Sequence, residues 1–95
     1  YTIIANDGTD YQTRSGLVNF SLVNKAGTET AGLGTVVNES VAASTGTLTV
    51  SFDTDTSPTN AVNIRANAVS SLTQTTLSIR YWVELDGAAV TVTPQ

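Results

Sequence analysis

The sequence predicts an all-β protein, an antiparallel β-sandwich of the Ig-like or jelly-roll-like kind, with about seven short strands and little or no helix. Three observations predict it. Apolar residues recur with a period of two, turn residues interrupt the chain roughly every 10–14 residues, and β-branched Thr and Val are frequent. At 95 residues the chain is expected to form one domain, residues 1–95.

The first half of the chain contains three short apolar runs that we expect to be strands. They are separated by Asn6-Asp7-Gly8 and Lys25-Ala26-Gly27, whose residue types favour turns. The expected strands are Thr2–Ala5, Leu17–Val23 and Leu33–Asn38. Only Glu39–Ser44 could form a turn or two of helix, because β-branched residues oppose a helix elsewhere.

The clearest alternation lies in the second half of the chain. Thr47–Asp53 places three large apolar side chains on one face and polar residues on the other, which is typical of a half-buried strand. Ala61–Ala68 repeats this pattern. Thr75–Leu85 is the longest expected strand, again with one apolar and one polar face.

Asp86-Gly87 is the strongest hairpin signal in the chain, because a type I′ turn needs positive φ at both central residues and favours Asp-Gly. We therefore expect a last strand over Ala89–Thr93, paired antiparallel with Thr75–Leu85. The expected core consists of the large apolar residues of these runs: Phe20, Leu48, Val50, Phe52, Ile64, Leu77, Ile79, Tyr81 and Val83. The free energy gained by burying such a core barely exceeds the entropic cost of ordering a small domain. Association with other chains would therefore add the missing stability.

Most catalytic chemistry is missing from this sequence. It contains no Cys and no His, which removes thiolate nucleophiles, disulfides, the commonest general base and the commonest transition-metal ligand. We therefore expect no enzyme activity, no catalytic residues, no metal site and no cofactor. Two acidic clusters, Asp7 with Asp10 and Asp53 with Asp55, leave Ca²⁺ binding open, although solvated turns are the favoured interpretation.

The charge pattern points to protein partners. The formal net charge is −4, and the four basic residues are spread along the chain: Arg14, Lys25, Arg65 and Arg80. Nucleic-acid binding needs a basic stripe, which this chain lacks, so we expect no nucleic acid. We expect no membrane partner either, because no apolar run approaches the roughly 20 residues that span a bilayer and no basic cluster suits an anionic surface.

Trp82 is the residue most informative about function. By the alternation of Thr75–Leu85 it lies with Arg80 and Glu84 on the polar face of the strand. Trp and Arg are enriched at binding hot spots, so these three residues form the expected interface. Arg65 would be the cation partner of the indole if it lies on a neighbouring strand. The alternative is a shifted register that places Trp82 in the core.

The stretch Ser71–Leu85, S-L-T-Q-T-T-L-S-I-R-Y-W-V-E-L, resembles strand segments of small all-β virion proteins of tailed bacteriophages. These include capsid cement (decoration) proteins and β-sandwich modules of tail parts. The resemblance covers the C-terminal half of the chain and carries over no residue roles, because no family motif is matched. It implies a structural role on the surface of a phage particle, without an active site, and a homo-oligomer such as a trimer.

The expected function is therefore that of a non-catalytic virion structural protein. It would dock on a capsid or tail lattice and stabilise it through β-face and edge contacts, with its own copies and the capsid or tail protein as partners. Scarce lysine supports this, because lysine commonly guards strand edges. One alternative is a carbohydrate- or cell-surface-binding module in which Trp82 and Tyr81 or Tyr11 stack on sugars. Another is an adhesin- or pilin-like subunit that accepts a partner's strand.

Overall fold

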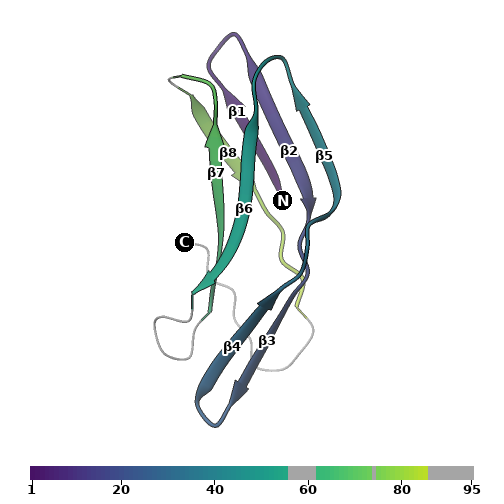
Figure 1. Cartoon of the computed structure of the whole chain (residues 1–95), viewed down its shortest axis with the longest axis vertical. Helices are drawn as coiled ribbons and strands as arrows, with labels where there is room; N and C mark the ends of the chain where they lie inside the picture. The colour runs from purple at the N-terminus through teal and green to yellow at the C-terminus, as the bar shows by residue number, and fades with distance from the viewer. Residues whose placement is uncertain (56–61, 74, 86–95) are drawn as a thin grey trace.

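The computed structural model describes residues 1–55, 62–73 and 75–85, and these residues form eight β-strands in antiparallel sheets (Figure 1). The strands are β1 (Thr2–Asn6), β2 (Tyr11–Leu17), β3 (Phe20–Lys25), β4 (Thr28–Leu33), β5 (Val37–Ala43), β6 (Leu48–Asp55), β7 (Asn63–Ser70) and β8 (Thr76–Arg80). The predicted all-β, antiparallel, sandwich-like fold is confirmed, with eight strands where about seven were expected.

Two layers of strands form what we call the body of the molecule. One layer is a four-stranded sheet with the order β5-β2-β1-β8, and the β6–β7 hairpin crosses in front of it (Figure 1). The β3–β4 hairpin extends beyond the body as an arm (Figure 1). The molecule is therefore elongated, with extents of 51 × 25 × 17 Å. Its radius of gyration is 15.5 Å, where a compact chain of this length has about 12 Å.

A very small core joins the two layers of the body. Three hydrophobic residues of the described chain are fully buried: Ile3 and Ala5 from β1, and Leu48 from β6. The partly buried side chains around them are Tyr1, Val50, Ala68 and Leu72. This cluster contains few large side chains, so it contributes only a small part of the burial that a sandwich of this length usually achieves.

The core expected from the sequence is therefore largely wrong. Leu48 is buried, while Phe20, Val50 and Phe52 are half-buried. The remaining expected core residues are exposed: Ile64, Leu77, Ile79, Tyr81 and Val83. Two of them, Leu77 and Ile79, do lie on the inner face, because they pair with the buried Ala5 and Ile3. They are exposed there because β8 is an edge strand among the described strands, and two strands cannot cover a sheet of four.

A buried amide on β2 links the two layers. Gln12 is completely buried; its Nε2 donates to the backbone oxygen of Thr45 and to Ser71 Oγ, both at 2.9 Å. Its Oε1 accepts from the Ser70 hydroxyl at 2.7 Å. Ser71 Oγ also accepts the backbone N–H of Thr47 at 2.9 Å. These bonds, which we call the Gln12 clamp, satisfy the buried amide and fasten the turns at the ends of β6 and β7 to the larger sheet.

Arg14 provides a second link between the layers, two residues after Gln12 on β2. Its Nη1 donates to the backbone oxygen of Leu48 at 2.8 Å, and its Nη2 donates to Glu39 Oε1 at 2.7 Å. The pair with Glu39 joins β2 to β5, and the bond to Leu48 joins β2 to β6. The hydrogen bond to Glu39 raises the pKa of the guanidinium above its ordinary value.

Several expected boundaries in the first half of the chain are wrong. Leu17–Val23 is divided between two strands, because β2 ends at Leu17 and β3 begins at Phe20, where the chain leaves the body for the arm. Residues 34–36 connect β4 to β5, so Leu33–Asn38 is not one strand. Glu39–Ser44 lies mostly in β5, whose pairing with β2 prevails over any local helical tendency. The sequences of β2 and β4 are mostly polar and lack alternating apolar residues, so the period-two pattern does not predict these strands.

The second half of the chain matches the sequence more closely. β6 and β7 lie over the expected runs, and the pairing of Phe52 with Ala66 confirms the predicted apolar faces. β8 covers only the start of Thr75–Leu85: it ends at Arg80, which pairs with Thr2, the first residue of β1. The Asp86-Gly87 turn and the expected strand Ala89–Thr93 lie outside the described residues.

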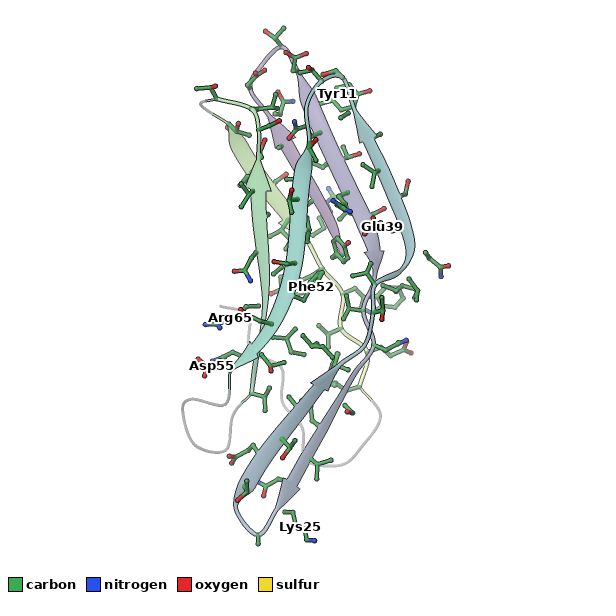
Figure 2. The ribbon with its side chains drawn as sticks, in the orientation of Figure 1. Tyr11, Lys25, Glu39, Phe52, Asp55 and Arg65 are labelled. Atoms are coloured by element: carbon green, nitrogen blue, oxygen red, sulfur yellow. The ribbon has the colours of Figure 1, made fainter. Side chains whose placement is uncertain are left out.

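The arm is held together by a tight turn. Lys25 pairs with Thr28, and the two residues between them have positive φ, 53° at Ala26 and 82° at Gly27. Positive φ at both central residues is the requirement of a type I′ hairpin turn, which confirms the turn expected at Lys25-Ala26-Gly27. Figure 2 shows Lys25 at the tip of the arm, remote from the body.

Candidate docking surface

The segment from β8 to Val83 presents a run of exposed apolar side chains. All five residues of β8 are exposed, with Leu77 at 48% and Ile79 at 49%. Tyr81, Trp82 and Val83 follow, and Trp82 is 86% exposed. We call these five side chains the β8 surface. Several large apolar side chains exposed along one short segment are typical of interaction sites on small proteins.

Three of the four predicted interface residues lie along this segment. Arg80 ends β8, and Trp82 and Glu84 follow it in residues 81–85, which form no strand. The strand alternation used to place Trp82 on a polar face therefore does not apply. Its exposure is nevertheless incompatible with the alternative that Trp82 lies in the core. An interface role for these residues stays a prediction.

The fourth predicted residue, Arg65, lies elsewhere. It is on β7, which pairs with β6, whereas Arg80 is on β8, which pairs with β1, so the condition for pairing Arg65 with Trp82 is not met. Arg65 Nε instead donates to Asp53 Oδ1 at 2.6 Å, and its Nη1 lies 4.0 Å from Asp55 Oδ2. Figure 2 shows Arg65 and Asp55 at the same end of the β6–β7 hairpin. The hydrogen bond from Arg65 lowers the pKa of Asp53.

The other acidic cluster has structural partners as well. Asp7 Oδ1 accepts the backbone N–H groups of Asp10 at 2.7 Å and of Thr9 at 2.9 Å, and these bonds lower the pKa of Asp7. Asp10 Oδ1 accepts the hydroxyl of Ser44 at 2.9 Å. The Asp7 carboxylate thus fixes the turn between β1 and β2, the role that Asp commonly has in turns. In the described ranges, no group of three or more His, Cys, Asp or Glu is placed to hold a metal ion.

A second set of exposed apolar side chains lies away from β8. It includes Leu22 and Val23 on the arm and Val37 and Val41 on β5. Sequence reasoning missed the exposure of both sets because alternation shows which side chains share a face but not whether a second layer covers that face. The low proportion of charged residues, 13%, was the one available signal that apolar surface would remain at strand edges.

The arrangement offers exposed apolar side chains, and carboxylates with structural hydrogen-bond partners. Among residues 1–55, 62–73 and 75–85 there is no helix long and apolar enough to cross a membrane. Comparisons of the chain with protein-family models, with curated proteins and with solved structures find no match.

Proposed function

We propose that this chain is a non-catalytic structural subunit that docks on a larger lattice and stabilises it through β-face and edge contacts. The observation that carries the proposal is the contrast, within the described part of the chain, between three fully buried hydrophobic residues and the many large ones left exposed. Moving exposed apolar side chains out of water lowers the free energy of the system, so this surface favours association.

The total surface of the chain supports the same proposal. It exposes 6818 Å², about 1,600 Å² more than the roughly 5,200 Å² expected for a compact monomer of 9.9 kDa. An interface of standard size buries about 800 Å² on each partner. The surplus is therefore enough for one or two such interfaces per copy, and covering it would supply the stability that the small core lacks.

A capsid or tail lattice of a phage-like virion is the setting that we propose for this docking. The support is the resemblance of Ser71–Leu85 to strand segments of virion β-proteins, and this stretch contains most of the β8 surface. Cement proteins act through many weak contacts repeated around a shell, and repetition raises the total affinity far above that of one contact. A small, weakly charged domain with an exposed Trp suits that task.

The first experiment compares Trp82→Ala with Tyr11→Ala, a substitution of a second exposed aromatic residue, which lies at the end of the body remote from the arm (Figure 2). Trp82→Ala should weaken docking roughly 30-fold, the effect of a hot spot worth about 2 kcal/mol, and change the unfolding free energy by less than about 0.5 kcal/mol. Tyr11→Ala should change neither. Cosedimentation with intact particles and urea titration measure the two quantities. Undiminished docking of Trp82→Ala would contradict the assignment of this surface.

The second experiment varies the salt concentration. Apolar contacts are not screened, so docking should persist at 1 M salt, where the Debye length is about 3 Å. Release of the subunit from particles at high salt would contradict an apolar docking surface and point to an electrostatic one.

The adjacent, exposed Tyr81 and Trp82 also favour a second candidate, a carbohydrate- or cell-surface-binding module, since exposed aromatic rings stack on sugars. A glycan array with and without EDTA tests it. Saturable binding to one glycan class that Trp82→Ala abolishes would support this candidate over docking on a lattice.

A further inference from the structure

The arm and the body belong to one long hairpin that bends where they meet. β2 continues into β3, β4 continues into β5, and the two chains pair on both sides of the bend (Figure 1). Their register shifts twice there. Asn38 and Glu39 lie opposite Gly16 alone, and residues 34–36 lie opposite residues 18 and 19. We call residues 16–19 and 34–39 the joint.

Both shifts add their extra residue to the same chain of the hairpin. A β-bulge of this kind bends its strand and increases the local twist. Asn38, in the first bulge, has φ of 54°, a conformation in which Asn is enriched. In the second bulge Gly34 N donates to Asn19 O at 2.8 Å, so backbone bonding continues through the bend. The arm therefore leaves the body through two defined bulges and not through free linkers.

Val36 is the residue of the second bulge that turns inward. It is half-buried, whereas Gly34, Thr35 and Val37 are exposed. Its side chain fills the space above Gly16, since a Cβ atom on Gly16 would lie 2.8 Å from Val36 Cγ1. Real Cβ atoms do not approach a neighbour this closely, so a side chain at position 16 would displace Val36.

Tyr1 connects this bulge to the second layer. Its backbone N and O exchange hydrogen bonds of 2.9 and 3.1 Å with Gly16, so the two residues face the same side of the sheet. The Tyr1 ring covers Gly16, with Cε1 and Oη each 3.3 Å from the same Cβ position. Its centroid lies 5.0 Å from that of the Phe52 ring on β6, in an edge-on contact. Tyr1 thus packs between the joint and β6.

Arg14 makes the corresponding connection at the first bulge. Its Nη2 donates at 2.7 Å to Glu39, one of the two residues opposite Gly16. Its Nη1 donates at 2.8 Å to the backbone oxygen of Leu48 on β6. The Arg14 side chain is only 22% exposed, so this connection is less screened by solvent than a surface ion pair. Each bulge of the joint is therefore tied to β6 by one side chain of the four-stranded sheet.

We propose that Tyr1 and Arg14 form a lock that holds the arm at one angle to the body and couples that angle to β6. The two side chains start from the same sheet and reach the same strand of the other layer. A swing of the arm has to break at least one of their contacts, and a displacement of β6 passes to the arm through them. The lock fixes the direction of the arm and not the stability of its own pairing. It does not depend on the proposed docking function, because it acts in the free chain.

The test measures distances from the tip of the arm to the body in the free chain. The sequence contains no cysteine, so two introduced cysteines can carry a pair of spin labels. Lys25→Cys is combined with Ala42→Cys on β5 or with Val69→Cys on β7, strands on opposite sides of the body (Figure 1). The six residues of β3 span about 20 Å, so a swing of roughly 20° would move Lys25 by about 7 Å. Double electron–electron resonance should give one narrow distance distribution for each labelled pair.

Gly16→Ala should release the lock. The added methyl group displaces Val36, so both distance distributions should broaden or shift by several ångströms. The matched control is Gly32→Ala, which adds the same methyl group on the arm outside the joint. There it meets Ser21 Oγ at 3.0 Å, a hydroxyl that can rotate away, so both distributions should stay unchanged. Wild-type distances in Gly16→Ala would overturn the lock.

Val36→Ala and Val37→Ala form a second matched pair of neighbouring residues. Val36→Ala removes the methyl groups above Gly16 and should broaden both distributions. Val37→Ala truncates a side chain that is 42% exposed and should leave them narrow. Equal effects of the two substitutions, or broad distributions in the wild type, would overturn the lock.

Phe52→Leu tests the connection to β6. It removes the ring contact with Tyr1 but keeps an apolar side chain, so circular dichroism should show an unchanged fold. The distances to the arm should nevertheless broaden, although Phe52 lies in the other layer. A folded Phe52→Leu variant with wild-type distances would overturn the coupling of the arm to β6.

Discussion

The body and the arm are built from the same kind of strands but are stabilised in different ways. In the body, the core around Leu48, the Gln12 clamp and Arg14 all connect one layer of strands to another. In the arm, β3 and β4 pair with each other, and among the described strands β4 also contacts β6. A hairpin without a covering layer is marginally stable in water.

Folding stability and exposed apolar surface therefore lie in different parts of the molecule. Links between layers remove side chains from water and fix the body as a unit, whereas the arm keeps Leu22 and Val23 exposed. The arm thus resembles β8 in exposing large apolar side chains. Substitutions that cut the links of the body should therefore have much larger effects than substitutions in the arm.

The largest effect is expected from the core. Leu48→Ala removes a side chain that is 1% exposed and should lower the unfolding free energy by about 2–5 kcal/mol. Leu22→Ala on the arm is the matched control and should cost less than about 1 kcal/mol, because Leu22 is exposed. Urea titration followed by circular dichroism measures both. Equal losses of unfolding free energy in the two variants would contradict the inference that the body contributes more to stability than the arm.

The Gln12 clamp should give the next largest effect. Gln12→Leu removes the hydrogen bonds that Gln12 makes with the hydroxyls of Ser70 and Ser71 and with the Thr45 carbonyl, at a cost of about 1–3 kcal/mol. Combined with Ser71→Ala, the losses should be less than additive, because both substitutions break one network. Purely additive losses in a double-mutant cycle would show that the clamp does not act as a unit.

The turn of the arm should give a smaller effect of the opposite sign. Ala26 adopts φ of 53°, which costs an L-residue roughly 1–2 kcal/mol, and Asn tolerates this conformation better. Ala26→Asn should therefore slow amide exchange in β3 and β4 and leave the amides of the body unchanged. Gly27→Ala, at φ of 82°, should accelerate exchange in the same strands. Equal changes of the amide exchange rates in β1 and β2 would show that the arm and the body unfold together, contrary to this prediction.

The smallest effect is expected from acidification. Asp53 has a lowered pKa because Arg65 donates to it, and Asp7 has one because the backbone N–H groups of Asp10 and Thr9 do. A lowered folded-state pKa stabilises the fold above the ordinary value of 3.8, and this stabilisation is lost as the pH falls below 3.8 through the lowered value. Both carboxylates are solvent-exposed, so the effect is screened.

Asp53→Asn and Asp7→Asn measure the two contributions. Each variant should be less stable than the wild type at pH 7, and the difference should vanish toward pH 2 in urea titrations. A difference that is independent of pH would show that the carboxylate charge is not what stabilises these sites.

The candidate surface was predictable in part. The sequence pointed to Trp82, Arg80 and Glu84, and the structure places all three along one exposed segment. Arg65 was grouped with them only on the condition of a neighbouring strand, and strand order, which depends on contacts far apart in the sequence, put it in the other layer. Alternation of apolar residues predicts Leu77 and Ile79 in the core, because this pattern cannot distinguish a face covered by a second layer from an uncovered one.

The class of structure and the shared faces of the clearest strands follow from local sequence, because backbone alternation and turn chemistry are local properties. Leu48, Val50 and Phe52 share a face wherever their strand lies, and Ala26-Gly27 turns wherever the arm points. Long-range packing settles which faces are covered, which described strands lie at sheet edges, and which polar side chains, such as Gln12 and Arg14, link the layers. Those outcomes depend on how many strands each layer receives, a property of long-range pairing that no local pattern contains.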